Sequence, residues 1–295
     1  MADASAQAEI RGIDIDKLAK GFADEVLVLK NFVTVTKTSA REIRWYTKTA
    51  GFLDSVDTTA ITASQIANTS SKSLPVVVEQ SWTRNTSYVK KYFVESPWLS
   101  DEDIKDNDVD ILATNVRDLV KSVANQVDVR ILAVLGDTLG TGGNVNTAAA
   151  VADGWDDAVT GDPISDILTA IENIRTYRYD TSNLVMYIHP GDYTSLINYL
   201  INVKGSSIPN FSSEKVRSGV VTEILGVKVV VSVNASEDTA VVFVPKVACT
   251  WKQFTPITSA VLKDPGIGTK IRVWEEGEAI LHDPRAVHVI TDIKV

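Results

Sequence analysis

Three acidic residues close together, Glu275, Glu276 and Glu278, are the first feature of the sequence with residue types suited to catalysis. Paired carboxylates can bind a divalent cation or share acid and base roles in hydrolysis. The group surrounds Gly277 in a strand-turn context, where a solvated bend is the commoner explanation. We therefore expect these side chains to face solvent in a protein that does not use them for catalysis. The alternative is an enzyme that uses these carboxylates.

The three histidines, His189, His282 and His288, show no arrangement typical of a metal site. None belongs to a His-Glu-x-x-His motif, and no pair has a typical zinc-ligand spacing. His189 lies where a predicted strand turns into a helix, so we expect a structural role for it. The sequence predicts no metal site, no cofactor and no catalytic residue.

The remaining motifs are also poor candidates for chemistry. Residues 136–143 are rich in glycine, but they lack the Gly-Lys-Ser/Thr ending of a phosphate-binding loop and follow a helix. No Gly-x-Ser-x-Gly elbow is available to activate a serine. Cys249, the single cysteine, lies in an apolar run and is expected to be a buried small hydrophobic residue. The sequence thus favours a protein without enzymatic activity.

Length and charge narrow the class of protein. A chain of 295 residues can bury a substantial core, and its net charge of -9 argues against binding nucleic acid by neutralising phosphates. No apolar run approaches the ~20 residues that span a bilayer, and the first residues do not read as a signal peptide. We expect the chain to remain where it is made, away from membranes.

A long two-stranded ribbon is predicted between residues 38 and 94. Residues 42–48 and 82–94 alternate as strands do, and residues 54–73 between them are dominated by Thr, Ser and Ala. Because an isolated two-stranded ribbon is only marginally stable in water, we expect it to lie on a neighbouring subunit. Its aromatic and basic residues are typical interface anchors, although such mixing can also stack single-stranded bases. The predicted contact residues are Arg41, Arg44, Trp45, Lys48, Lys72, Trp82, Arg84, Lys90 and Lys91.

Charge is divided unevenly along the chain. Residues 37–92 carry eight basic and four acidic side chains, whereas residues 101–166 carry four basic and fourteen acidic ones. A basic ribbon and an acidic body would attract each other between copies and improve encounter and register. The alternative is that both are simply solvated faces.

A mixed α+β body follows the ribbon. Apolar residues recur with helical spacing from about residue 106 to residue 135, before Gly136, which predicts a helix of about 30 residues. The other elements expected from periodicity are a helix over 13–30, a loop over 136–161, a helix over 164–174, a strand over 184–188, a helix from Pro190, and strands over 227–233, 240–244, 270–274 and 286–293.

This order of elements resembles that of the major capsid proteins of tailed bacteriophages and archaeal tailed viruses, which have the Hong Kong 97 fold. Trp98-Leu99-Ser100-Asp101-Glu102 is similar to the junction where the family's extended loop returns to its spine helix. Met186-Tyr187-Ile188-His189-Pro190-Gly191-Asp192 resembles the strand-to-helix turn of its axial domain. The strands over 224–230 and 240–243 look like its paired strands, and 274–287 like the closing strands of its peripheral domain.

The resemblance implies a domain plan and a function. The plan comprises an N-terminal arm with a helix over 1–36, an extended loop over 37–95, a peripheral domain with the spine helix over 96–160, an axial domain over 161–255, and closing strands of the peripheral domain over 256–295. The implied function is a structural coat protein of the virion, assembled in the host cytoplasm. Its pentamers and hexamers would form an icosahedral shell that encloses double-stranded DNA without reading its sequence.

Two departures from the family pattern lead to further expectations. Many members begin with a long scaffolding extension, whereas here the ribbon starts near residue 40 after Met1. We therefore expect a separate scaffolding protein or none. Some members join a lysine of the extended loop to a late asparagine; here Lys72 is the candidate donor, but the last asparagine is Asn234, so we expect no such crosslink.

The alternative within the same fold is an encapsulin, a cellular compartment whose shell encloses cargo enzymes. A viral shell implies portal and decoration proteins as further partners, whereas a compartment implies a cargo enzyme. The sequence alone leaves both open.

Overall fold

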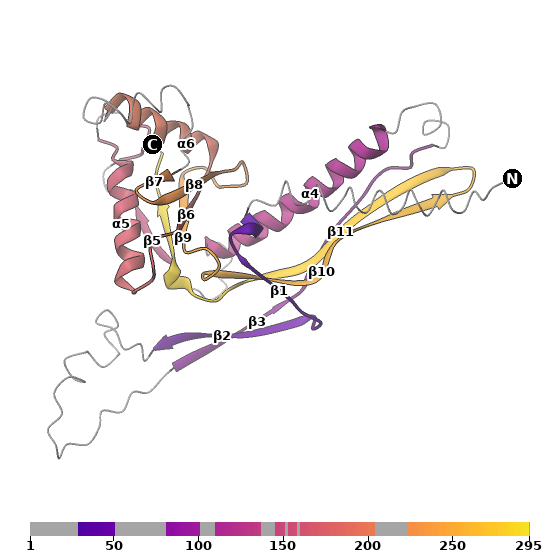
Figure 1. Ribbon diagram of the computed structural model, residues 1–295, viewed down its shortest axis with the longest axis horizontal. Coiled ribbons are helices and arrows are strands. Elements are labelled where there is room, and N and C mark those ends of the chain that lie inside the picture. Colours follow the sequence, from indigo (N-terminus) through magenta and orange to yellow (C-terminus); the bar gives the residue numbers. More distant parts are fainter. Residues whose placement is uncertain are drawn as a thin grey trace, which may run out of the picture. The chain divides into compact units, whose positions relative to one another are not determined.

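The computed structural model describes residues 29–50, 81–100, 110–136, 145–150, 153–157, 160–203 and 223–294. Its strands form a four-stranded, a six-stranded and a two-stranded sheet (Figure 1). Contacts divide the chain into two units. The described residues of the first unit fall within 1–43, 87–132 and 250–280, and those of the second within 44–86, 133–249 and 281–295.

The first unit is built on the four-stranded sheet, in the order β1-β10-β11-β4. β1 runs parallel to β10, and β11 runs antiparallel to β4 with Trp274 opposite Phe93. Before β1 lies a short 3-10 turn, η1. The bounds are Leu29–Asn31 for η1, Thr34–Lys37 for β1, Lys90–Glu95 for β4, Cys249–Asp264 for β10 and Gly268–Leu281 for β11.

The predicted long helix is α4, Asp110–Leu135, and it packs on one face of this sheet. The core between them joins its valines to alternate residues of the strands: Val116, Val120, Val123, Ala124, Ile257, Ile271 and Val273. The helical prediction is confirmed over these residues, and the helix ends just before Gly136. The acidic start expected at residues 106–108 lies outside the described part of the chain.

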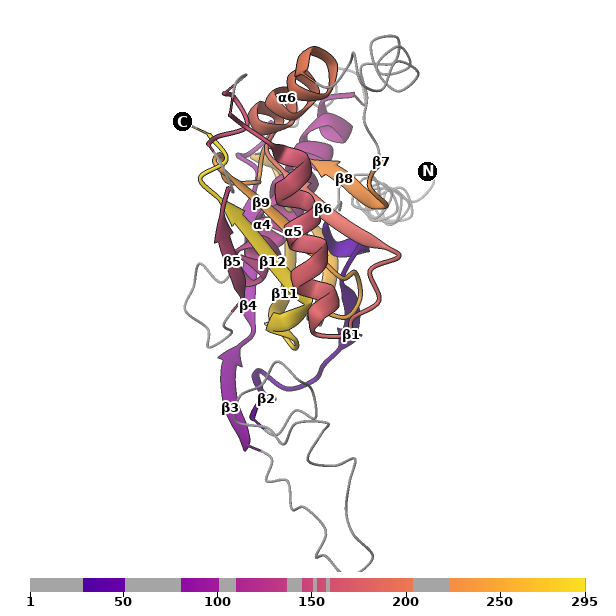
Figure 2. The ribbon, with the colours of Figure 1, turned by 90° about the vertical axis from the view of Figure 1, so that its left-hand side faces the viewer.

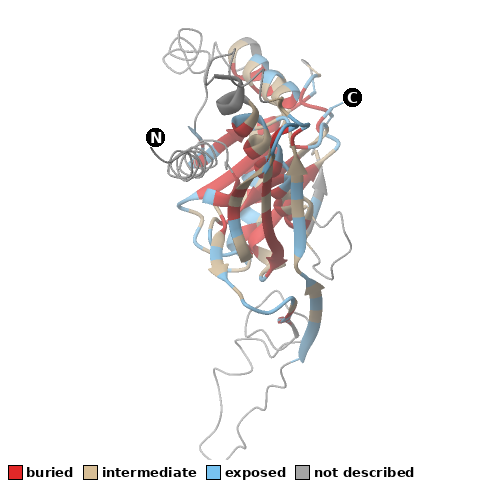
Figure 3. Cartoon of the chain, turned by 90° about the vertical axis from the view of Figure 1, so that its right-hand side faces the viewer, coloured by how far each residue is buried: buried red, intermediate tan, exposed pale blue. Residues whose placement is uncertain are grey.

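The second unit contains the six-stranded sheet, in the order β5-β12-β9-β6-β8-β7. Its central strand β6, Leu184–Ile188, is buried along its whole length, as its continuous apolar run predicts. Figure 3 shows that buried residues, in red, gather along several strands. The other strands are β5, Asn146–Ala149; β7, Glu223–Ile224; β8, Val227–Val231; β9, Thr239–Phe243; and β12, Val287–Thr291, which follows the 3-10 turn η3, Pro284–Ala286.

Two helices accompany this sheet (Figure 2). α5, Pro163–Thr176, packs against β12, and Asp162 caps its start by accepting a hydrogen bond from the Ser165 amide. α6, Pro190–Asn198, begins at the proline predicted to start it and continues into a π-helical turn, Tyr199–Val203. Proline suits a first helical turn because its missing N–H has no intrahelical partner there.

The structure corrects several sequence-based expectations. Residues 146–149, predicted as loop, form β5 and pair with β12. The strand predicted over 286–293 is observed as β12, which pairs with β9 in the six-stranded sheet. β10 is absent from the strands that periodicity predicts, because Pro256 and several interspersed hydroxyl residues obscure its period. The predicted helix over 13–30 lies almost wholly outside the described residues.

The ribbon prediction is confirmed for β2, Glu42–Ala50, and β3, Ser81–Tyr88, which form the two-stranded sheet. The second predicted strand, over 82–94, is in fact two strands. The chain leaves β3 at Val89, whose amide donates a hydrogen bond of 2.9 Å to the Arg41 carbonyl, and then enters β4 in the four-stranded sheet.

Candidate subunit interface

The two faces of the ribbon differ in burial because side chains alternate along a strand. On one face of β2, Ile43, Trp45 and Thr47 are buried. Asn85 of β3 adds to this face, donating a hydrogen bond of 3.0 Å to the Thr47 hydroxyl. The ribbon is therefore partly supported by its own chain.

Trp45, one of the predicted contact residues, is buried within its own chain. Its side chain is only 8% exposed, and its indole Nε1 donates a hydrogen bond of 3.1 Å to the Leu281 carbonyl. Both residues belong to the second unit. The alternation that places Trp45 on the buried face was visible in the sequence, but which face would be buried was not.

The opposite face of the ribbon is exposed and aromatic. Tyr46 is 61% exposed, Trp82 54% and Tyr88 64%. Arg44 and Arg84 alternate with these rings and are exposed as well. We name these five residues the ribbon face. Tryptophan, tyrosine and arginine dominate the energetics of protein interfaces, so this composition suits a contact surface.

The remaining predicted contact residues divide into three cases. Lys90 is exposed at the start of β4. Arg41 and Lys91 are mostly exposed but form ion pairs with Glu276 of the same chain, at 3.6 Å and 3.7 Å. The described structure at Lys48 is confined to the backbone, and Lys72 lies outside the described residues.

The acidic group at 275–278 is not a solvated bend, so that prediction is wrong. It lies within β11, where Glu275, Glu276 and Glu278 are all buried. Each carboxylate has a cationic partner in the first unit: Lys30 pairs with Glu275, and Arg130 of α4 pairs with Glu278. The signal that sequence reasoning missed is the alternation along β11: Ile271 and Val273 line the core, and Glu275, the next residue in this alternation, is buried as well.

Burial affects the electrostatics of Glu278. It raises the pKa of the Glu278 carboxyl above its ordinary value, while Arg130 acts in the opposite direction. It also raises the pKa of the neighbouring Tyr92 hydroxyl to about 12. Glu275 is held by further donors, since the Trp251 indole Nε1 lies 3.1 Å from its Oε1 and the Gln253 amide Nε2 lies 3.3 Å from it. Glu278 therefore joins β11 to α4, whereas Glu275 joins β11 to η1 and β10.

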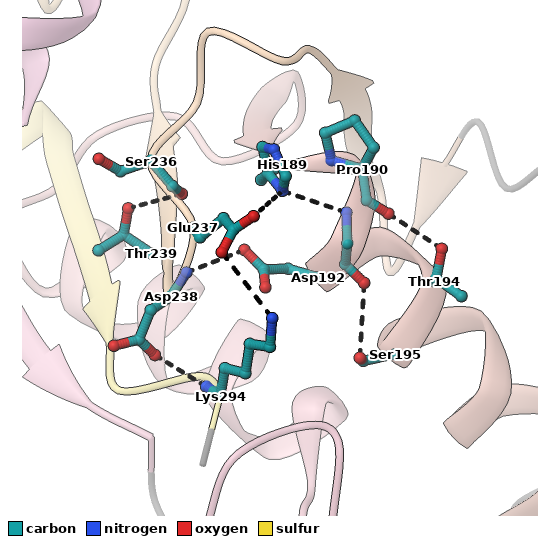
Figure 4. A network of polar contacts seen from close by, with 11 residues as sticks. His189, Pro190, Asp192, Thr194, Ser195, Ser236, Glu237, Asp238, Thr239 and Lys294 are labelled. Carbon is teal, nitrogen blue, oxygen red and sulfur yellow. Dashed lines mark hydrogen bonds and ion pairs between the residues drawn. The ribbon is translucent and has the colours of Figure 1, made fainter.

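The histidines also have structural surroundings. His189 Nδ1 accepts a hydrogen bond of 3.2 Å from the Gly191 amide at the start of α6 and lies 3.8 Å from Glu237, which also pairs with Lys294 (Figure 4). His288 is buried in β12, and this burial lowers its pKa to about 4. Within the described ranges, no group of three or more His, Cys, Asp or Glu residues is arranged to hold a metal ion.

Two further expectations concern Cys249 and the glycine-rich segment. Cys249 is buried at the start of β10, as predicted. Residues 137–143 lie outside the described part of the chain, so the prediction of an ordinary loop there stays a prediction. None of the described helices is long and apolar enough to cross a membrane.

Comparisons with known proteins identify the family. A model of the phage capsid protein family matches residues 84–290. A virus-like particle protein from Pyrococcus furiosus is 14% identical, with a TM-score of 0.62 over 95% of this chain and 99% of the other. The capsid of Cyanophage P-SCSP1u is 13% identical, with a TM-score of 0.62 over 90% of this chain and 88% of the other.

The capsid of a native GTA particle shows the same fold, at 12% identity and a TM-score of 0.64 over 90% of both chains. No curated protein sequence matches the chain. The structural matches extend across both units, and the mixed helix-and-strand architecture agrees with the Hong Kong 97 fold expected from the sequence. The chain belongs to the phage capsid protein family and is a structural protein of the virion.

Proposed function

We propose that copies of this chain form pentamers and hexamers that close into an icosahedral shell around double-stranded DNA. The observation that carries this proposal is the ribbon face. Three large aromatic side chains are more than half exposed on a two-stranded sheet to which no further described strand is paired. Such a surface gains stability when a second molecule covers it.

The occupant we propose for the ribbon face is the adjacent copy. Family membership supports this choice, since a capsid subunit is surrounded by copies of itself. The structural relatives include a virus-like particle and two capsids, which are shells built from many copies. We assign the four-stranded sheet and α4 to the peripheral domain and the six-stranded sheet to the axial domain.

The enclosed DNA is proposed to contact the shell without being gripped by it. The net charge of -9 leaves little capacity to neutralise phosphates. Scaffolding, portal and decoration proteins remain expected partners of the shell. Particles isolated from the producing cells should contain nuclease-protected double-stranded DNA; a cargo enzyme in its place would support the compartment alternative.

Substitutions on the ribbon face test the proposed contact. Trp82→Ser and Arg84→Glu should each reduce the yield of closed particles at least tenfold, because a central aromatic or arginine anchor contributes about 2 kcal/mol or more. Electron microscopy and size-exclusion chromatography of the full-length chain measure the yield. Val233→Ser provides the control: Val233 is 79% exposed on the second unit and lies off the ribbon. Ribbon variants that assemble as well as the wild type would disprove the contact.

A further inference from the structure

The ribbon joins the rest of the chain beside one residue of β11, at the start of β2 and the end of β3. The β4–β11 ladder runs from Glu95 opposite Arg272 to Lys90 opposite Gly277. On one side, β3 ends at Tyr88, and the chain passes through Val89 into β4 at Lys90. On the other side, Arg41 immediately precedes β2, and its carbonyl accepts the 2.9 Å hydrogen bond from the Val89 amide. Glu276, opposite Lys91, stands where the ladder gives way to the ribbon.

Glu276 holds a cation from each side of this root. The Arg41 guanidinium lies 3.6 Å from its Oε2, and the Lys91 ammonium lies 3.7 Å from its Oε1. The Glu276 side chain is only 9% exposed, whereas the two cations remain largely in solvent. All three residues belong to the first unit. We name them the Glu276 clamp.

Aromatic rings seat the two cations. Arg41 lies over the ring of Phe254, 4.9 Å from its centroid, and Lys91 lies over Phe93 at 5.0 Å and Trp274 at 5.7 Å. Cation–π contacts restrict where each side chain can move. A nearly buried carboxylate is costly without its cations, so Glu276 restrains both roots together.

A restraint at the root has a large effect at the tip. A strand of nine residues is about 30 Å long at about 3.3 Å per residue, so a turn of roughly 10° at the root moves its far end by about 5 Å. Subunits that contact each other through the ribbon face need a reproducible ribbon direction to close into one shell size.

We propose that Glu276 is the positioning residue that fixes the direction of the ribbon and thereby selects a single shell geometry. This inference rests on the proposed contact between the ribbon face and the adjacent copy. Glu276 itself does not need to contact the adjacent copy. Without the clamp, copies still associate, but through ribbons whose direction varies.

The test substitutes the carboxylate with its neutral isostere, Glu276→Gln, in the full-length chain. We expect particles at near wild-type yield with a broadened range of diameters in electron microscopy. We also expect amide exchange at Val89 to increase at least tenfold in the unassembled chain, as the root loosens. A single wild-type diameter with unchanged exchange would overturn the proposal, and so would a complete loss of particles from a folded variant.

The matched control is Glu95→Gln. Glu95 is also a carboxylate between two cations of β11, 2.7 Å from Lys270 and paired with Arg272, but it lies at the opposite end of the ladder. It should assemble with the wild-type diameter; equal broadening would show a general charge effect and overturn the inference. Arg41→Gln retains Glu276 and should broaden the range of particle diameters less than Glu276→Gln does. If Glu276→Gln does not fold, Arg41→Gln tests the proposal in its place.

The outcomes separate this inference from the proposed function. If Trp82→Ser and Arg84→Glu assemble normally, the ribbon contact itself fails, whatever Glu276→Gln does. If they lose assembly while Glu276→Gln matches the wild type in diameter and exchange, the ribbon contact stands and the clamp is wrong.

Discussion

At the scale of single residues, the ion pair between Arg130 and Glu278 shows why charged side chains can lie inside this protein. The Glu278 side chain is fully buried and that of Arg130 only 12% exposed. Moving an ion from water into the protein interior costs roughly several kcal/mol, so a buried ion is tolerated only beside a partner of opposite charge. The pair therefore connects α4 to β11 and is sensitive to the loss of either member.

Arg130→Met should lower the free energy of unfolding by about 3–5 kcal/mol, because it leaves the Glu278 carboxylate buried without its cation. Denaturant titration of the unassembled chain at pH 7 measures the loss. The double variant Arg130→Met with Glu278→Met should recover most of it, since apolar residues can replace a buried pair. A double variant no more stable than the single one would contradict this explanation.

Residue-level inference from the sequence succeeded where local chemistry was sufficient and failed where a distant partner decides. Cys249 in its apolar run and Pro190 at a helix start are placed correctly. The acidic residues around Gly277 were expected in solvent. Their burial depends on Lys30 and Arg130, which are more than a hundred residues away along the chain.

At the scale of elements, β12 contains a titratable residue in the interior of the six-stranded sheet. His288 lies opposite Val242 of β9 and Asn146 of β5, with 1% of its surface exposed. Burial lowers its pKa to about 4, from an ordinary value of 6.5. Below pH 6.5 the unfolded chain binds a proton at His288, whereas the folded chain does not bind it until about pH 4. The free energy of unfolding therefore decreases as the pH falls from 6.5 to about 4.

His288→Met should remove this contribution. Between pH 7 and pH 4 the wild type should lose on the order of 3 kcal/mol more unfolding free energy than the variant, from 1.4 kcal/mol per pH unit. Denaturant titrations at pH 7, 5.5 and 4 give the comparison. His282→Gln changes an exposed histidine and should leave the wild-type slope. Equal slopes for wild type and His288→Met would show that His288 is not the group responsible.

Helices and strands could be predicted where burial imposes a clear pattern of apolar residues. β6 is apolar throughout, α4 carries a single apolar face, and both were predicted. β5 and β10 were missed because their pairing partners, more than their own residues, make them strands. β10 lies between β1 and β11, and both form hydrogen bonds with its backbone although its sequence is irregular.

At the scale of the whole molecule, opposite charges along one chain should affect how copies meet. Residues 37–92 carry a net charge of +4 against -10 for residues 101–166. If the basic segment meets the acidic one of another copy, raising the salt concentration from about 0.05 M to 0.5 M should slow assembly several-fold, since screening shortens the range of attraction. Light scattering follows the rate. Arg84→Gln should reduce this salt dependence, and a rate independent of salt would contradict the electrostatic contribution.

The candidate interface shows the same limit of prediction at this scale. The sequence identified the ribbon and its aromatic and basic residues, but strand alternation alone could not tell which face of β2 is buried. The structure shows Trp45 on the buried side and Tyr46, Trp82 and Tyr88 on the exposed side. It also shows that Arg41 and Lys91 contact Glu276 within the same chain.

The measurement that tests the central claim most directly is a cryo-electron microscopy reconstruction of particles assembled from the full-length chain. We predict rings of five and six copies in a closed shell, with the Tyr46, Trp82 and Tyr88 side chains covered by the adjacent copy. Closed particles in which these three side chains remain open to solvent would contradict the account.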